Sequence, residues 1–439
     1  MASRFTKKQL TGFRDAAQSL KLYRRADLRN ETNGESLIEE LYVDPLPYEH
    51  ILQTMLKANT TFLIGRKGTG KSTIFKRVQH DLAKRSDYTT AYIDIKTVYE
   101  LSKPDSALIA KVDANSGVMP KESLGKLHLN RAFLQTTIKQ IHDQLKERAN
   151  STLLARIKRF FSGTIDELFE DLDVLLNEIE KNRYTSITGI RTISAHDKSG
   201  LSTESGSEGA AGINLGPTTG LTASLKITDA NKASLDRDQS YTDTLILEFN
   251  ITHYLLRLKE LLDRISIKHL YIFIDDFSEL PEDAMKIVVD TLLAPLNNWS
   301  EELIKFKIAA YPGRIYYGDI DKTKIDEINL DFYRLYAAKN LATMEDKAID
   351  FTRRLIQSRL KYFCKCDASV FIEVKNDEIW RNFFYATMAN PRNLGYILFY
   401  LYESHLLFDR LITVSALKEA ARRYYEEKIE PYFKMNKFL

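Results

Sequence analysis

Residues 60–72 read Thr-Thr-Phe-Leu-Ile-Gly-Arg-Lys-Gly-Thr-Gly-Lys-Ser. The first five, Thr60–Ile64, are β-branched or apolar and predict a short buried strand. The remaining eight fit the spacing of a glycine, four residues and then Gly-Lys-Ser, and a helical pattern follows from Thr73 to about Lys84. Glycines let such a loop curl so that its backbone N–H groups point inward, and the next helix adds a partial positive charge. The stretch therefore predicts a phosphate-binding loop between a strand and a helix.

This loop predicts a nucleoside-triphosphate site. Lys71 would bring a mobile positive charge to the β- and γ-phosphates, and the Ser72 hydroxyl would help to coordinate Mg²⁺. The residues expected to contact the nucleotide are Gly65, Lys67, Gly68, Thr69, Gly70, Lys71, Ser72 and Thr73.

A second motif supports the same site. The apolar run His269–Ile274 predicts a buried strand, and Asp275 and Asp276 follow it directly. We expect Asp275 to hold Mg²⁺, mostly through water, and Asp276 to polarise the attacking water molecule. Glu279 is the alternative for the second role.

Strands and helices alternate around these motifs. Further strands are expected at Thr89–Ile95, Phe306–Ala310 and, as a candidate fifth, Ile328–Leu335, with helices at about 48–57 and over Glu282–Leu293. Such alternation is typical of an α/β fold whose parallel sheet is covered by helices on both faces.

Three arginines are candidates for contact with the γ-phosphate. Arg314 follows the predicted strand Phe306–Ala310, where it would sense the γ-phosphate of its own subunit or reach a neighbour's nucleotide as an arginine finger. Arg334 competes for the finger role. Arg392 lies in a predicted helix start, Asn390-Pro391-Arg392, and either reaches over the nucleotide or belongs to an ordinary helix beginning with proline.

The chain divides into a core over 41–342 and flanking segments. The first 29 residues hold eight Lys or Arg against two Asp, so 1–40 is expected to be a basic arm that contacts phosphate backbones or docks as an amphipathic helix. Within the core, 105–240 is expected to be an insertion, helical at first and then flexible, with a β-hairpin as an alternative for part of it. Residues 185–240 hold no aromatic residue and 7 of the 18 glycines. A helical domain is expected over 343–439.

Composition excludes several classes of protein. The 439 residues are 44% hydrophobic and 28% charged, which excludes a disordered or fibrous chain, and the net charge of +3 argues against a wholly basic surface. The two cysteines predict free thiols in a reducing compartment rather than a disulfide framework. No apolar run is long enough to span a membrane, and we expect a cytoplasmic protein without membrane contact.

Together, the phosphate loop, the Asp275-Asp276 strand end, the Arg314 loop and the Arg392 helix resemble the AAA+ superfamily, over about residues 41–100 and 245–403. The chain is most similar to the origin-recognition-complex-type initiator ATPases and their prokaryotic relatives, and similar also to the STAND signalling ATPases. The Asp-Asp pair and Pro391 are typical of STAND proteins, whereas Arg392 is typical of initiators.

This resemblance implies ATP and Mg²⁺ bound between the core and a helical lid, and slow hydrolysis to ADP and phosphate. Initiators usually carry glutamate where Asp276 stands, and a misplaced water-orienting group costs on the order of a hundredfold in rate. The expected role is a nucleotide-controlled assembly switch, acting with copies of itself or with a partner protein, on or near DNA. A signalling or antiviral-defence ATPase that gates an effector without DNA is the alternative, and a metabolic kinase is a third interpretation.

Overall fold

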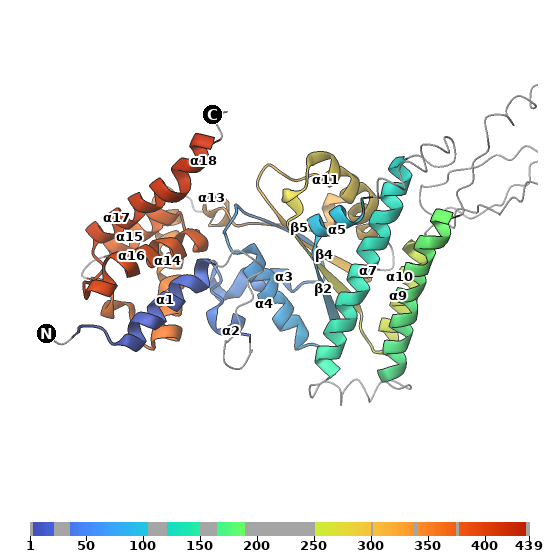
Figure 1. The fold of residues 1–439 in the computed structure, drawn as a ribbon, viewed down its shortest axis with the longest axis horizontal. Coiled ribbons are helices and arrows are strands. Elements are labelled where there is room, and N and C mark those ends of the chain that lie inside the picture. The colour runs from blue at the N-terminus through green and yellow to red at the C-terminus, as the bar shows by residue number, and fades with distance from the viewer. Residues whose placement is uncertain are drawn as a thin grey trace, which may run out of the picture.

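Five parallel strands form the centre of the computed structural model, which describes residues 3–21, 36–103, 121–149, 165–188, 251–299, 302–336, 340–374 and 377–435 (Figure 1). The strands are β1 (Thr60–Ile64), β2 (Tyr88–Asp94), β3 (His269–Asp275), β4 (Ile304–Ala310) and β5 (Ile325–Asn329). Their order across the sheet is β2-β3-β4-β1-β5, and every neighbouring pair is parallel. The prediction of an α/β fold with a five-stranded parallel sheet is confirmed.

The fifth strand is where the sequence prediction was wrong in position. The expected strand Ile328–Leu335 overlaps β5 only at its first two residues, and a short helix, α13 (Phe332–Leu335), begins shortly afterwards. The Asp331 carboxylate caps this helix by accepting a hydrogen bond from the Tyr333 backbone N–H at 3.1 Å. An N-terminal cap of this kind favours a helix over a continued strand.

Helices cover both faces of the sheet because successive strand residues point to opposite sides. In β3, Ile272 and Ile274 pack in the larger hydrophobic core with α7 (Lys121–Ala149), α10 (Ile251–Arg264) and α11 (Glu282–Val288). Tyr271 and Phe273 point the other way, into a core shared with α3 (His50–Met55) and α4 (Lys71–Ala83).

The predicted core helices are present with shifted bounds. The helix expected at 48–57 is α3, preceded by a 3₁₀ turn at Pro47–Glu49. The helix expected over Glu282–Leu293 is α11, a π-helical turn at Val289–Leu293 and then α12 (Ala294–Asn297). A further helix, α5 (Ile95–Leu101), directly follows β2.

Two long helices occupy the described part of the expected insertion. The helix α7 packs on β2 and α5, and the Gln144 side chain accepts hydrogen bonds from Thr90 N at 2.7 Å and Thr89 Oγ1 at 2.8 Å. The helix α9 (Ile165–Thr188) packs against α7 and α10. Residues 104–120, 150–164 and 189–250 lie outside the described residues, and with them most of the segment expected to be flexible.

A second hydrophobic core lies beside the sheet and is built from helices that are far apart in the sequence (Figure 1). The helix α1 (Lys7–Lys21) packs on α14 (Leu341–Cys364) and α16 (Pro391–Ser404) through buried Phe13, Ala17 and Leu20. We call this group of helices the lid. Its other helices are α15 (Glu378–Thr387), α17 (Val414–Tyr424) and α18 (Glu430–Met435).

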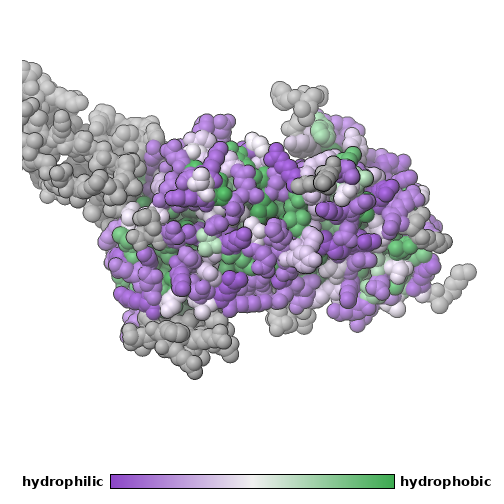
Figure 2. All heavy atoms as spheres, turned by 180° about the vertical axis from the view of Figure 1, so that it is seen from behind, coloured by the Kyte–Doolittle hydropathy of each residue, from purple (hydrophilic) through white to green (hydrophobic). Residues whose placement is uncertain are grey.

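On the face drawn in Figure 2, the described residues are mainly hydrophilic, and hydrophobic residues form scattered patches. Among the described helices, none combines the length and apolar character that crossing a membrane requires.

Candidate functional site

The predicted phosphate loop connects β1 to α4 at the carboxyl edge of the sheet. The Gly65 N–H donates to the Ala310 carbonyl at 3.0 Å, which fixes the start of the loop to β4. Gly68 and Gly70 have φ values of 87° and 90°, a left-handed region that side chains disfavour, and Gly70 is the N-cap residue that precedes α4. The local backbone thus requires glycine at these two positions, and the loop ends at the positive end of a helix dipole.

Lys71 is the buried cation of this loop, with 8% of its surface exposed. Its Nζ donates to the carbonyl oxygens of Gly65 at 2.6 Å and Arg66 at 3.1 Å and lies 4.5 Å from the centre of the Tyr311 ring. Burial lowers the pKa of Lys71 to about 8, which leaves it mostly protonated at neutral pH. Neutral carbonyls are weaker partners for an ammonium than phosphate oxygens, so this cation is available to an anionic ligand.

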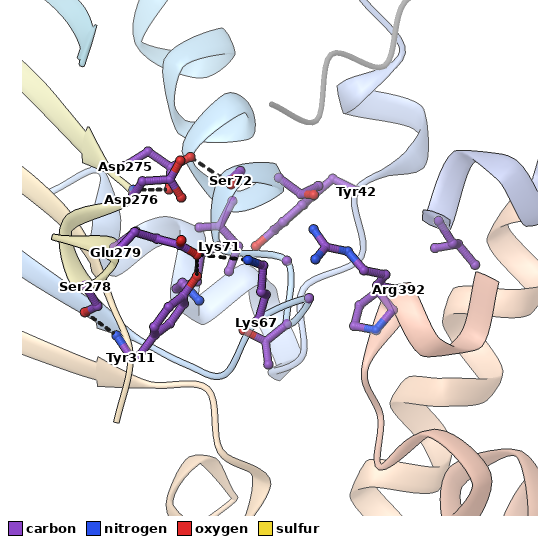
Figure 3. Close-up of a pocket in the computed structure, with 18 of the residues that line it drawn as sticks. Tyr42, Lys67, Lys71, Ser72, Asp275, Asp276, Ser278, Glu279, Tyr311 and Arg392 are labelled. Atoms are coloured by element: carbon purple, nitrogen blue, oxygen red, sulfur yellow. Dashed lines mark hydrogen bonds and ion pairs between the residues drawn. The ribbon is translucent and has the colours of Figure 1, made fainter. Parts of the chain in front are cut away.

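Asp275, at the end of β3, is held by donors from three directions. Its Oδ2 accepts hydrogen bonds from the Ser72 hydroxyl at 2.9 Å and from the Tyr92 hydroxyl, while its Oδ1 accepts from the Asp276 N–H at 3.0 Å. The Ser72 and Asp275 pair predicted from sequence is therefore brought together (Figure 3). Tyr92 extends from the neighbouring strand β2 and was not predicted.

Two further carboxylates lie beside Asp275. Asp276 has a φ of 55°, and solvent reaches its side chain from the pocket. Partial burial and the charge of Asp275 raise the pKa of Asp276 to about 6. Glu279 accepts hydrogen bonds from the Tyr311 hydroxyl at 2.7 Å and from Lys67 Nζ at 2.9 Å, and these two bonds lower its pKa.

The end of β4 contributes a tyrosine rather than the expected arginine. Tyr311 lines the pocket, whereas Arg314 does not and donates from Nη2 to the Leu280 carbonyl at 2.8 Å. The Tyr311 N–H donates to the Ser278 hydroxyl, which in turn donates to the Arg314 carbonyl. These bonds hold the Arg314 loop against the residues after β3, so the expectation that Arg314 faces the nucleotide of its own subunit is not met. Arg334 is exposed on α13 and does not line the pocket either.

The lid reaches the loop through the start of α16. Arg392 lines the pocket and extends toward the loop from the side opposite Asp275 and Asp276 (Figure 3). Its charge contributes to the lowered pKa of Lys71. The helix begins at Pro391, as predicted, with Asn390 as its N-terminal cap. The sequence singled out Arg392 but gave no role to Asn390.

The pocket continues away from the loop into a second part, which we call the distal end, and its total volume is about 1050 Å³. This end is lined by residues of α1, α14 and the segment before α3: Ser19, Leu20, Leu41, Tyr42, Val43, Pro45, Phe351, Leu355 and Arg359. Such a volume is at the upper limit of those typical of small-molecule sites.

Arg359 is the cation of this distal end. Only 3% of its surface is exposed, its Nη1 donates to the Leu41 carbonyl, and its Nε has no hydrogen-bond partner among the described residues. Burial lowers the pKa of Arg359 to about 10. The recurrence of Phe351, Leu355 and Arg359 at four-residue intervals is visible in the sequence and places them on one helix face, but only the fold shows that this face lines the pocket.

A magnesium site here would depend on two protein side chains. Across the described ranges, no group of three or more His, Cys, Asp or Glu side chains is arranged to hold a metal ion. The Ser72 hydroxyl and the Asp275 carboxylate are hard oxygen donors in contact with one another, which suits an ion that takes its other ligands from phosphate and water.

Comparison with known proteins found no matching family model, no matching curated protein and no matching solved structure.

Proposed function

We propose that this chain is an ATP-binding protein of the AAA+ type that hydrolyses ATP slowly and uses the nucleotide to control its assembly. The observation that carries this proposal is the 2.9 Å hydrogen bond between Ser72 and Asp275, which are 203 positions apart in the sequence. It joins the end of the phosphate loop to the end of β3 at the edge of a parallel sheet, the usual place for a ligand in such folds. A hydroxyl, a carboxylate and the Lys71 ammonium at this edge are the protein groups that a magnesium–triphosphate complex requires.

The phosphates would lie in the glycine loop. Lys71 exchanges its bonds to the Gly65 and Arg66 carbonyls for stronger bonds to phosphate oxygens, and the α4 dipole favours the same charge. Ser72 and Asp275 would hold Mg²⁺, which neutralises phosphate charge when it is bound. The nucleoside would lie in the distal end, with Tyr42, Leu355 and Arg359, because the whole pocket has a volume of about 1050 Å³.

Slow turnover is supported by the state of the two acids next to Asp275. With its pKa raised to about 6, Asp276 is a better proton acceptor than an ordinary aspartate and is mostly ionised at neutral pH. Glu279 accepts hydrogen bonds from Tyr311 and Lys67 at Oε1, and these bonds lower its pKa, so it is a weaker proton acceptor than an unpaired glutamate. Asp276 has a shorter side chain than glutamate, and the Glu279 carboxylate is already hydrogen-bonded to Lys67 and Tyr311. Neither carboxylate is therefore preorganised for fast hydrolysis.

Control of assembly is supported by the way in which the pocket is shared. The core supplies Lys71, Ser72 and Asp275, whereas the lid supplies Arg392, Arg359 and α1. A triphosphate that contacts both parts favours one arrangement of lid and core, and loss of the γ-phosphate removes part of that preference. The exposed basic residues Lys7, Lys8 and Arg14 on the outer face of α1 favour action on or near DNA.

A second candidate is a signalling or defence ATPase that gates an effector without DNA. The Asp275-Asp276 pair and Pro391 at the start of α16 favour it. ATPase rates measured with and without double-stranded DNA, at two salt concentrations, distinguish the two candidates. Stimulation that weakens with salt supports the DNA-associated function.

The core of the proposal is tested by titration calorimetry with ATP and Mg²⁺. We expect the wild-type protein to bind and Lys71→Ala to bind at least 100-fold more weakly, on the order of the loss of one buried charge pair. Lys84→Ala, at the other end of α4 and outside the pocket, is the matched control and should bind like wild type. Absence of binding by the wild-type protein refutes the function, and mass photometry that gives one species with and without ATP refutes the assembly role.

A further inference from the structure

The Asn390 side chain forms hydrogen bonds with two separate parts of the molecule. Its Oδ1 accepts from the backbone N–H groups of Arg392 at 3.1 Å and Asn393 at 3.3 Å, which caps α16 in the lid. Its Nδ2 donates to the Lys67 carbonyl in the phosphate loop at 2.9 Å. One amide thus connects the first turn of the lid helix to the backbone that would hold phosphate.

This connection depends on the absence of a side chain at Gly68. A Cβ atom built there would lie 2.6 Å from Asn390 Oδ1 and 3.0 Å from Arg392 Cβ. The loop and the lid helix are therefore in contact at a position where any side chain would separate them. The left-handed φ of 87° at Gly68 independently requires glycine.

The bond to Lys67 fixes the direction of one peptide group. In a trans peptide the C=O and N–H groups point in opposite directions, so holding the Lys67 oxygen toward Asn390 directs the Gly68 N–H away from the lid. If this peptide rotated by half a turn, the oxygen would replace the N–H and repel a phosphate. Asn390 therefore holds the Lys67–Gly68 peptide in one of its two orientations, with the N–H directed away from the lid.

We propose that Asn390 is a positioning residue that couples the lid to the phosphate loop, so that docking of the lid prepares the loop for a triphosphate. The proposal rests on the proposed function for its ligand, but the coupling itself is a property of the protein alone. Closure of the lid and phosphate affinity are then linked in both directions, because each favours the same peptide orientation.

Three substitutions separate this role from simple helix capping. Asn390→Ser and Asn390→Asp keep an oxygen that caps α16, but serine is too short to reach Lys67 and aspartate has no N–H to donate. Asn390→Ala loses both functions. Asn393→Asp is the control for added charge, because it places a carboxylate in the same helix turn, outside the pocket, and keeps an acceptor for the Tyr424 hydroxyl.

The first measurement is hydrogen exchange of the loop amides at residues 66–71 without nucleotide. We expect faster exchange in Asn390→Ser and Asn390→Asp and wild-type exchange in Asn393→Asp. The second measurement is the affinity for ATP with Mg²⁺ by calorimetry, where both Asn390 variants should bind about tenfold more weakly, the effect of one lost hydrogen bond. The unfolding midpoints of the serine and aspartate variants should stay near wild type, while that of Asn390→Ala falls.

The outcomes are distinct. Wild-type exchange in Asn390→Ser, or faster exchange without loss of affinity, overturns the proposal and leaves Asn390 as a helix cap. If Asn393→Asp weakens ATP binding as much as Asn390→Asp does, the added charge explains the effect, and the proposal is again overturned. If the wild-type protein binds no ATP but the loop exchange still increases in Asn390→Ser, the coupling stands and the proposed function fails.

Discussion

Gly395 and Gly125 are both helical glycines, yet we predict opposite effects when each is replaced by alanine. At Gly395, in α16, a Cβ atom would lie 2.8 Å from both the Ala17 carbonyl oxygen and the Lys21 nitrogen of α1. These are backbone atoms, so α1 and α16 must move apart to accept it. At Gly125, in α7, a Cβ atom would meet nothing within 4 Å.

The expected magnitudes follow from these distances. Alanine in a helix is more stable than glycine by about 0.5–1 kcal/mol, so Gly125→Ala should increase the free energy of unfolding by that amount. At Gly395 the same gain is opposed by overpacking, which costs about 1–3 kcal/mol. The net effect of Gly395→Ala should be a loss of about 1–2 kcal/mol in lid stability.

Urea denaturation followed by tryptophan fluorescence measures this difference. The chain has two tryptophans, and Trp380 is buried in the lid core, whereas Trp299 packs against the core that contains α7. A Trp299→Phe background therefore reports on the lid for Gly395→Ala, and a Trp380→Phe background reports on the α7 core for Gly125→Ala. Ser19 and Leu20 of α1 line the pocket, so Gly395→Ala should also weaken ATP binding while Gly125→Ala leaves it unchanged. If Gly395→Ala stabilises the lid as Gly125→Ala stabilises α7, the close packing of α1 on α16 is refuted.

Two further predictions concern charged groups in the pocket. Asp276→Asn should bind ATP without turnover, measured as phosphate release. Normal turnover in that variant would assign the water-positioning role to Glu279. Folding raises the pKa of the Asp276 carboxyl to about 6, so this group contributes to the free energy of unfolding below its pKa in the unfolded chain, and the contribution is lost as the pH rises through 6. Thermal unfolding should therefore show that Asp276→Asn gains stability relative to wild type between pH 4 and pH 8. Arg359→Met removes a buried guanidinium that has no carboxylate partner among the described residues. Urea denaturation should therefore show a free energy of unfolding equal to or above that of wild type. Calorimetry should show weaker ATP binding. A large loss of stability in Arg359→Met would contradict this account.

The parts of the fold that sequence predicted well are those fixed by local patterns. β1 was predicted residue for residue because Thr60–Ile64 are buried on both faces of the sheet and a glycine ends the run. β5 was misplaced because it is an edge strand that is not buried, with Asp326 and Asn329 half-buried and Glu327 exposed. Such a strand lacks the apolar pattern of a buried one, while the apolar residues that follow it belong to a helix capped by Asp331.

The residues of the site also fall into those that local sequence patterns predict and those that only tertiary packing brings together. Lys71, Ser72 and Asp275 could be predicted because the carboxyl ends of parallel strands meet at one edge, which needs only the order of elements. Tyr92 is 183 positions from Asp275, and Asn390 is 323 positions from Lys67, so their bonds depend on tertiary packing that no local pattern encodes. The sequence position of Arg314 does not show that its guanidinium binds the Leu280 carbonyl, and its role as a finger toward a neighbouring subunit stays a prediction.

The position of α1 in the lid has a consequence for biosynthesis. The Gln9 carbonyl and the Cys364 thiol that contacts it are 355 positions apart, so α1 leaves the ribosome long before its partner helices are translated. Until then its apolar face, with Phe13 and Leu20, has no native surface to cover it. The apolar face of α1 is therefore the part of the lid that waits longest for its partners, and the pocket is complete only when Pro391 and Arg392 of α16 have been made.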